Sequence, residues 1–198
     1  MEALRYDEGK HQYFRGETPL VSVTQVIHSV WPRTDGAPVD AIERARLRGT
    51  WVDEKFMEYL TTDDGLVIPA GTPQEYADCL GQAVNWWEAE RAGSSVECQV
   101  RLFGEREAGT ADLIVNSREI IELKSTWEIS KTVPAQLGGY GDLFDEQQTG
   151  GSEHGMKCGV LHVHRRFKKA QFKAVDYPLA LGQWRIVRDF YRLINGVI

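Results

Sequence analysis

The sequence contains few cysteines, and they form no motif. Cys79, Cys98 and Cys158 are odd in number, lie far apart and include no C-x-x-C pair. This spacing argues against a disulfide framework and against a zinc knuckle, so we expect buried structural thiols. The five histidines match no metal-binding spacing either, and we expect them to be structural or surface residues.

Long apolar runs and a basic net charge are also absent. No stretch approaches the ~20 apolar residues that span a bilayer, and the N-terminal MEALRYDEGK lacks the basic-then-apolar layout of a signal peptide. We therefore expect a soluble, cytoplasmic protein with no membrane partner. The formal net charge of −6 argues against broad binding to polyanions. Basic residues nevertheless gather in two segments, 44–48 and 165–173, where local patches could bind phosphates.

The length of 198 residues suits one domain with a sizeable core, and no repeat, low-complexity segment or long linker divides it. We expect a single domain over 1–198, with a ribbon and short helix over 1–37 and the core over 38–198. Hydrophobic periodicity and turn residues predict its elements. They are a ribbon over 1–20, helices over 25–31, 39–60 and 73–92, strands over 96–103, 111–115 and 120–123, a helix over 134–144, strands over 159–164 and 170–175, and a last helix around 181–194, with loops over 32–37 and 147–155. This order predicts an α/β fold around one mixed sheet.

The stretch GTADLIVNSREIIELKS, residues 109–125, is the most informative part of the chain. Two short apolar runs flank the turn-forming Asn-Ser-Arg, which is typical of a β-hairpin. If these three residues form the loop, counting outward places Asp112 directly opposite Glu122 on one face of the hairpin. Lys124 falls on the same face by the period of two, whereas a shift of one residue in the loop would break this arrangement.

Two carboxylates and a lysine on an apolar hairpin are unfavourable unless they bind something, because close like charges repel and unpaired burial destabilises the fold. A divalent cation removes this difficulty, and hard oxygen ligands suit Mg²⁺ or Mn²⁺. The lysine could then hold or polarise a water molecule beside the metal. The alternative is a surface hairpin whose glutamate and lysine pair across solvent, since E-x-K is common by chance.

Further motifs accompany this hairpin. In chain order the set is PLVSVT at 19–24, RGTWVD at 48–53, GTAD at 109–112, ELK at 122–124, and a Q-x3-Y pair formed by Gln136 and Tyr140. In this order and spacing they resemble the PD-(D/E)XK nuclease superfamily, in its RecB-like and phage-exonuclease branch, over nearly the whole chain. The resemblance implies a restriction-endonuclease-like α/β core, with a central mixed β-sheet flanked by α-helices.

The resemblance also implies a chemistry for the hairpin. Asp112, Glu122 and the backbone carbonyl of Leu123 would bind one or two Mg²⁺, with Mn²⁺ as a substitute. Lys124 would orient or deprotonate the attacking water and offset phosphate charge. The branch usually carries histidine where this chain has Asp53, and aspartate is itself a good Mg²⁺ ligand. Asp53 is therefore either a third metal ligand or a plain surface acid. An iron–sulfur cluster is not expected, because the related cluster nucleases need four cysteines.

The remaining candidates surround this centre. Gln136 and Tyr140 would sit at its rim and position the DNA strand or the catalytic lysine. The candidate DNA contacts are hydroxyls at the start of the short helix, an arginine of the long helix and a basic turn, namely Ser22, Thr24, Arg48, Arg165, Arg166, Lys168 and Lys169. The alternatives are helix capping for Ser22 and a solvated charged face for the basic residues.

These motifs predict a metal-dependent DNA exonuclease that hydrolyses phosphodiester bonds at single- or double-stranded DNA ends, in recombination, repair or phage DNA processing. A structure-specific or nicking endonuclease of the same fold is one alternative. A non-catalytic DNA-end-binding or inhibitory module is another, although the intact acidic residues and lysine argue against it. Polarity, strand preference and oligomeric state stay open. Phage relatives often work with a recombinase or a single-strand-binding protein, and whether such a partner acts here also stays open.

Overall fold

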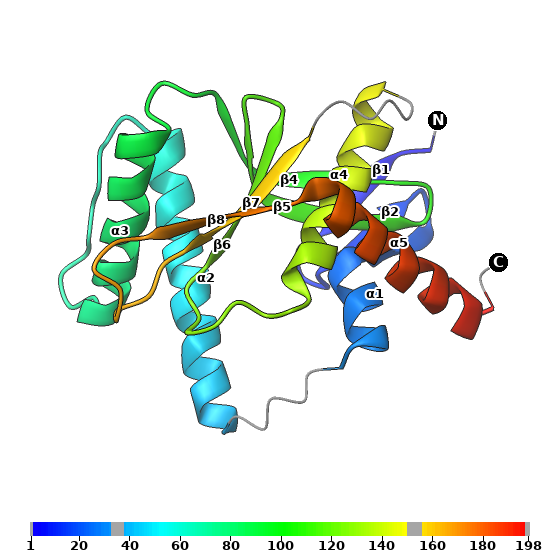
Figure 1. Cartoon of the computed structure of the whole chain (residues 1–198), viewed down its shortest axis with the longest axis horizontal. Coiled ribbons are helices and arrows are strands. Elements are labelled where there is room, and N and C mark those ends of the chain that lie inside the picture. Colours follow the sequence, from blue (N-terminus) through cyan, green and yellow to red (C-terminus); the bar gives the residue numbers. More distant parts are fainter. Residues whose placement is uncertain (1, 33–37, 150–155, 197–198) are drawn as a thin grey trace.

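The computed structural model describes residues 2–32, 38–149 and 156–196, which form one mixed eight-stranded sheet with helices on both faces (Figure 1). The elements in chain order are β1 (Leu4–Asp7), β2 (Gln12–Arg15), β3 (Thr18–Ser22), α1 (Val23–Val30), α2 (Val39–Thr61), α3 (Gln74–Glu90), β4 (Val96–Phe103), β5 (Glu107–Val115), β6 (Glu119–Lys124), α4 (Val133–Thr149), β7 (Lys157–His162), β8 (Gln171–Val175) and α5 (Tyr177–Ile194). Most boundaries lie within one or two residues of those expected, and the predicted α/β fold around a mixed sheet is confirmed.

The strands run in the order β1-β2-β3-β5-β6-β7-β8, and β4 pairs with β5 as well. Strands β6 and β7 are parallel, whereas the β4–β5, β5–β6 and β7–β8 pairs are antiparallel. Strand β3 pairs in parallel with the start of β5 at Glu107 and Ala108, so the N-terminal ribbon continues the sheet. No local sequence pattern predicts this join, because so short a parallel ladder leaves no periodicity to detect.

Three elements are longer than predicted, and one of them is α5, which begins at Tyr177, directly after its N-cap Asp176, instead of around residue 181. Helix α4 extends to Thr149, beyond the expected end at 144, because no glycine or proline follows Asp142 within it. Strand β5 begins at Glu107, because the small residues before Ala111 already pair with β4. The expected loops over 32–37 and 147–155 lie mostly outside the described residues.

Alternate side chains of β5 and β6 point to opposite faces of the sheet, as the period of two requires. Ile114 and Ile120 pack under α1, α4 and α5, whereas Leu113 and Ile121 pack under α2 and α3. Figure 1 shows the same division, with α2 and α3 side by side at one end of the molecule and the other helices at the opposite end. The two central strands are therefore held from both faces.

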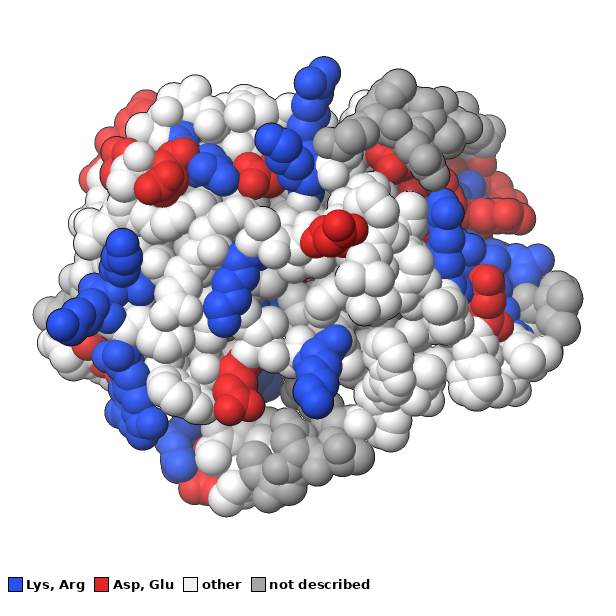
Figure 2. Space-filling model, viewed as in Figure 1, with Lys and Arg blue, Asp and Glu red and all other residues white. Residues whose placement is uncertain are grey.

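Charged side chains are unevenly spread over the face shown in Figure 2. Lysine and arginine side chains gather at its lower left, where Figure 1 shows the turn between β7 and β8. On the described part of the chain, none of the helices combines the length and the apolar character that crossing a bilayer requires.

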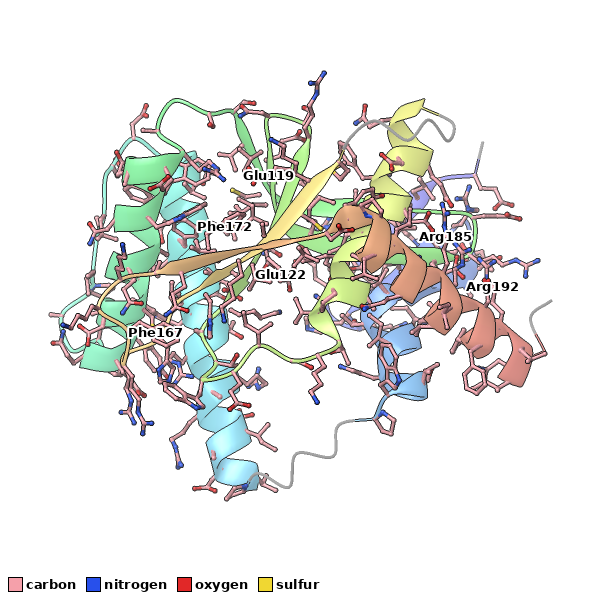
Figure 3. The ribbon with its side chains drawn as sticks, in the orientation of Figure 1. Glu119, Glu122, Phe167, Phe172, Arg185 and Arg192 are labelled. Carbon is pink, nitrogen blue, oxygen red and sulfur yellow. The ribbon has the colours of Figure 1, made fainter. Side chains whose placement is uncertain are left out.

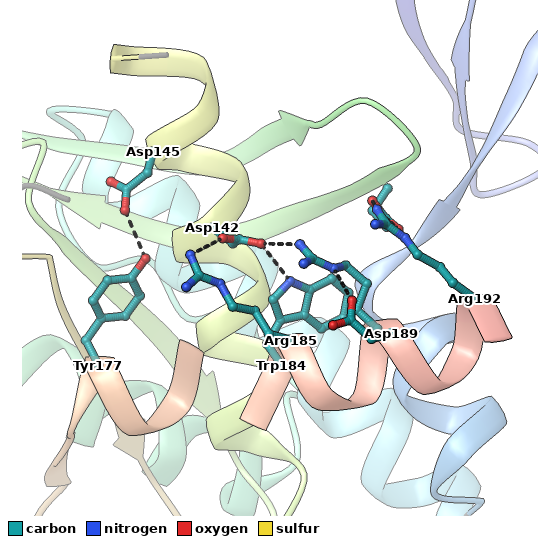
Figure 4. A network of polar contacts seen from close by, with 9 residues as sticks. Asp142, Asp145, Tyr177, Trp184, Arg185, Asp189 and Arg192 are labelled. Carbon is teal, nitrogen blue, oxygen red and sulfur yellow. Dashed lines mark hydrogen bonds and ion pairs between the residues drawn. The ribbon is translucent and has the colours of Figure 1, made fainter. Parts of the chain in front are cut away.

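Helix α5 is fastened by polar contacts to the elements it covers. Arg192, labelled in Figure 3, donates to both carboxylate oxygens of Glu107 at 2.9 and 2.8 Å. Asp142 of α4 accepts hydrogen bonds from Trp184 Nε1 at 3.1 Å and from Arg188 Nη1 at 2.7 Å (Figure 4). These contacts hold α4 from behind, so that its opposite face can reach the central strands.

The α4–α5 contact leaves no room for a side chain at Gly138. A Cβ there would lie 2.2 Å from the backbone oxygen of Ala180. We expect Gly138→Ala to lower the free energy of unfolding by ~1–3 kcal/mol, the usual effect of overpacking. Gly182→Ala in α5, where a Cβ meets nothing within 4 Å, should instead raise it by up to about 1 kcal/mol. Urea denaturation measures both variants, and equal effects would contradict this description of the contact.

Candidate active site

The two edges of β5 are occupied differently. Ala108 pairs with β4 and β3 at once, and Leu113 pairs with β4 and β6 at once. Because β4 takes one edge, β3 and β6 must share the other, one at each end. The β5–β6 ladder ends at the pair of Leu113 and Ile121, so the strands separate beyond it. We call the region between residues 109–112 of β5 and residues 122–124 of β6 the wedge.

The hairpin has the predicted register. Asn116–Arg118 forms the loop, with positive φ at Asn116 and Ser117, and Val115 pairs with Glu119 as expected. Asp112 and Glu122 are the next positions beyond the last ladder pair. They therefore face each other by register while their backbones have already separated.

Glu122 is the centre of the wedge and is only 3% exposed. Its Oε1 accepts hydrogen bonds from Lys124 Nζ at 2.6 Å and from Gln136 Nε2 at 2.8 Å. Gln136 Nε2 also donates to the Tyr140 hydroxyl at 2.9 Å. In the view of Figure 3, Glu122 lies near the middle of the molecule, between α2 and α4. Tyr140 is 4% exposed, so the expectation that it sits at the rim is wrong: it supports Gln136 from behind.

Asp112 is held from both neighbouring strands. Its Oδ2 accepts the backbone N–H of Leu123 at 2.9 Å, and its carboxylate also hydrogen-bonds the side chain of Gln99 on β4. The Leu123 carbonyl faces the same edge as its N–H, because the two groups of a strand residue point to one side. The backbone at Leu123 thus contributes both groups toward the wedge.

Gln99 is a site residue that the sequence-based prediction missed. It lies opposite Asp112, between the ladder pairs Cys98–Leu113 and Val100–Ala111, and its φ is +50°. A non-glycine residue in the left-handed region is strained, and such residues cluster at functional sites. No sequence signal marked it, because Gln99 fits the alternation of polar and apolar residues along the strand VECQVRLF.

Burial dominates the electrostatics of the wedge. It raises the pKa of Asp112 to about 7, and the charge of Glu122 adds to the rise. Burial also raises the pKa of Asp53 on α2 well above its ordinary value, with the charge of Asp112 as the next cause. Burial alone would lower the pKa of Lys124, but Glu122 and Asp112 outweigh it and raise that pKa above its ordinary value. The lysine is therefore an ammonium ion at neutral pH, among carboxyl groups from three elements.

The wedge offers oxygen donors of the kind that Mg²⁺ prefers. Glu122 Oε2 is buried and has no hydrogen-bond partner among the described residues, so a cation would satisfy it. Within the described ranges, however, no three acidic, histidine or cysteine side chains are placed to hold a metal together. The residues fit a site built on Asp112 and Glu122, with Asp53 close enough to influence its charge. That Asp53 is a third ligand stays a prediction.

The predicted contacts at the start of α1 serve the helix itself. The Ser22 hydroxyl accepts the N–H of Gln25 at 3.1 Å, and the Gln25 side chain accepts the N–H of Ser22 at 2.8 Å. Thr24 Oγ1 lies 3.1 Å from Ser22 Oγ. These contacts form a capping box, and a role of Ser22 and Thr24 in DNA binding stays a prediction.

Arg48 occupies a structural position instead of the surface position expected of a DNA contact. It is 9% exposed, and its Nη2 donates to the backbone oxygen of Ser125 at 2.8 Å. Its Nη1 lies 3.8 Å from a carboxylate oxygen of Glu75 on α3. Arg48 thus ties α2 to the loop that follows β6.

The basic turn between β7 and β8 is exposed, as predicted, in its four charged residues Arg165, Arg166, Lys168 and Lys169. Arg165 Nη1 forms an ion pair with Glu75 at 3.1 Å. The Arg166 guanidinium lies 5.0 Å from the ring centre of Trp127. The turn is therefore partly anchored, and its contact with DNA stays a prediction.

The raised pKa of Asp112 predicts a pH dependence of stability in metal-free protein. An acid with a higher pKa in the folded than in the unfolded state binds its proton more tightly when folded, so stability falls as pH rises from about 4 to about 7. Asp112→Asn keeps an acceptor for the Leu123 N–H and cannot ionise. We expect it to flatten this dependence and to raise the melting temperature at pH 8, as measured by calorimetry with a chelator present. Asp64→Asn, a change at an exposed acid, should leave the profile unchanged; a fall in stability of the Asp112 variant at pH 8 would contradict the assignment.

Comparison with known proteins gives matches by structure only: no family model and no curated protein matches the sequence. A crystal structure from Eubacterium rectale, described as a candidate exonuclease, matches with a TM-score of 0.59 and 14% identity, over 90% of this chain and 82% of that one. An alkaline exonuclease from Laribacter hongkongensis matches over 89% and 88% with 13% identity and a TM-score of 0.43, and its complex with dAMP with 12% identity and a TM-score of 0.38. The last two likenesses are too weak to carry an argument. The match to the first shows that the two proteins share a fold, and the α/β core with a central mixed sheet flanked by helices is the restriction-endonuclease-like architecture expected from the sequence.

Proposed function

We propose that the protein is a metal-dependent deoxyribonuclease that hydrolyses phosphodiester bonds as an exonuclease acting on linear DNA ends. The observation that carries this proposal is the convergence of Asp112, Glu122 and Lys124 in the wedge, where one buried carboxylate oxygen has no partner among the described residues. The fold shared with a candidate exonuclease supports nuclease chemistry. The proposed cofactor is Mg²⁺, with Mn²⁺ as a substitute.

Phosphodiester hydrolysis needs a positioned water and compensation for the negative charge that grows on the phosphate oxygens. A divalent cation held by Asp112 and Glu122 would supply both an activated water and charge compensation. Lys124 is protonated, because the carboxylates raise its pKa. In this state it donates hydrogen bonds to the water or the phosphate, which supports orientation and charge compensation over proton abstraction.

Gln136 and Tyr140 act in this proposal as positioning residues. Gln136 holds Glu122 through Oε1, which leaves Oε2 for the cation. Burial, and then the charge of Glu122, raises the pKa of Tyr140, so its hydroxyl stays neutral. It accepts the second hydrogen bond of the Gln136 amide, which fixes the orientation of that amide.

Digestion of linear and circular DNA with Mg²⁺ tests the exonuclease assignment. We expect linear DNA to be degraded and circular DNA to survive. Cleavage of both would show an endonuclease, and a mobility shift without product would show a binding module. Labelling either the 5′ or the 3′ end of the linear substrate would then give the polarity.

Lys124→Ala and Glu122→Gln should each reduce the cleavage rate more than tenfold while the fold is kept. Lys124→Ala removes the ammonium group that would face the phosphate, and Glu122→Gln removes the charge of a ligand of the proposed Mg²⁺. A tenfold loss corresponds to ~1.4 kcal/mol in the barrier. Lys157→Ala is the matched control, because Lys157 is an exposed lysine of β7. It lies opposite Glu119 in the β6–β7 ladder, at the other end from the pair of Lys124 and His162. Rates are measured with end-labelled DNA, and folding by circular dichroism. A Lys124→Ala rate within tenfold of wild type would remove this residue from the mechanism.

Asp53→Asn tests the third carboxylate. The change keeps the shape and removes the charge, so it should raise the Mg²⁺ concentration needed for half-maximal cleavage and lower the maximal rate. Asp53→His should recover part of the activity, most visibly with Mn²⁺, because imidazole suits softer metals. Glu54→Gln is the control, because Glu54 is the exposed neighbour on α2. If Asp53→Asn cleaves DNA as fast as wild type at limiting Mg²⁺, Asp53 is not a metal ligand and the site uses two carboxylates.

A further inference from the structure

A hollow of about 430 Å³ lies beside the wedge, between the loop that follows β6 and the β7–β8 hairpin. Its walls include Trp127, Ile129, His162, Phe167 and Lys173. The volume falls within the range of small-ligand sites, roughly 300–1,000 Å³. None of these residues takes part in the chemistry proposed above.

The hollow lies on the same face of the sheet as the wedge. Lys124 of β6 pairs in register with His162 of β7, and His162 pairs with Gln171 of β8. Paired residues of adjacent strands point to the same face, and adjacent strands lie ~4.8 Å apart. His162 is thus one strand away from the candidate catalytic lysine, which is close enough for a neighbouring nucleotide of a strand bound in the wedge.

Two aromatic side chains of the wall lie close together, and the His164 ring also packs against Trp127, with ring centres 5.3 Å apart and edge-to-face geometry. Trp127 is 52% exposed, although most large apolar side chains of this protein are buried. Its ring centre lies 6.1 Å from that of Phe167, with the planes tilted by 36°. The guanidinium of Arg166 lies 5.0 Å from the Trp127 ring centre. An exposed tryptophan with an arginine over its ring is the combination with which proteins stack unpaired bases.

His162 has one ring nitrogen that is hydrogen-bonded and one that has no partner in the part of the chain that the structure describes. Its Nε2 lies 2.6 Å from the backbone oxygen of Thr126, and since a carbonyl can only accept, Nε2 carries the proton. Burial lowers the pKa of His162 and so favours the neutral ring, in which Nδ1 is an acceptor. This Nδ1 is buried and has no partner among the described residues. An acceptor left unpaired destabilises the fold, and an N–H group of a base is a suitable donor for it.

Basic side chains lie on the side of the hollow away from the wedge, and the exposed Glu128 is the acidic residue in its wall. Lys173 lies in its wall, and the turn between β7 and β8 is the place where basic side chains gather in Figure 2. Among these, Lys168 and Lys169 are exposed. A strand leaving the hollow would therefore meet cations suited to its phosphates.

We propose that this hollow binds one unpaired nucleobase of the DNA strand, stacked on Trp127, next to the nucleotide whose phosphate lies in the wedge. The proposal rests on the proposed function in that its ligand is the DNA substrate. A base inside a duplex cannot stack on a tryptophan without leaving its pair. The DNA bound at the hollow is therefore single-stranded or locally unpaired.

Binding of a short fluorescein-labelled oligothymidylate, followed by anisotropy, tests this proposal. The comparison ligand is an abasic strand of equal length, which keeps the phosphates and lacks the bases. Ca²⁺ replaces Mg²⁺, because it also takes oxygen ligands but with a looser geometry, and a gel confirms that the strands stay intact. We expect the wild type to bind oligothymidylate at least about fivefold more tightly than the abasic strand, the lower end of one base–aromatic stack.

Trp127→Ala should abolish this preference for bases while leaving the affinity for the abasic strand unchanged, and Trp127→Phe should keep most of the preference. Phe190→Ala is the control, because Phe190 is 49% exposed on α5, away from the hollow. A wild type without the preference, or a Trp127→Ala protein that keeps it, overturns the proposal. Digestion of DNA with Mg²⁺ is scored separately. Cleavage without a Trp127-dependent preference for bases would support the nuclease function and overturn base binding in the hollow. A Trp127-dependent preference without cleavage would overturn the nuclease function alone.

Discussion

The separation of β6 from β5 is the constraint on which the candidate site depends. A continued ladder would hold Asp112 and Glu122 directly opposite each other, ~4.5–5.5 Å apart between Cβ atoms, and would use the backbone groups between them for pairing. Because the ladder ends at the pair of Leu113 and Ile121, the Leu123 N–H is free to bind the Asp112 carboxylate. Gln99 binds the same carboxylate from the other neighbouring strand. The orientation of Asp112 is thus set from both edges of β5.

Glycines let helix α4 approach β5 and α1 closely. A Cβ at Gly109 would lie 2.7 Å from the Tyr140 ring, and one at Gly139 would lie 2.7 Å from Val23. Interior glycines weaken an isolated helix by about 1 kcal/mol each relative to alanine. The contacts with α5 offset this loss, since Asp142 binds both Trp184 and Arg188. The result is that Gln136 and Tyr140 are presented to Glu122 from a rigid surface.

The loop after β6 joins the wedge to the neighbouring hollow. Its first residues are anchored through backbone carbonyls, Ser125 to Arg48 of α2 and Thr126 to His162 of β7. Both anchors are buried side chains, so the loop leaves β6 in a defined direction. Trp127 follows at once and is exposed. An exposed aromatic side chain therefore lies just beyond Lys124, at the end of the anchored part of the loop.

Local patterns in the amino-acid sequence were sufficient for the helices, the hairpin with its Asn116–Arg118 loop, and the common face of Asp112, Glu122 and Lys124, because these follow from periodicity and turn chemistry within a few residues. Ser22 as a helix cap is of the same kind. The folded chain alone decided the join of β3 to β5, the left-handed Gln99, the burial of Arg48 and Tyr140, and the hollow beside Trp127. Each of these depends on residues far apart in the sequence, as Arg48 and Ser125 are, and no local propensity encodes which distant groups will meet. The sequence could thus name the charged residues of the site, whereas only tertiary contacts could show how they are oriented and what lies beside them.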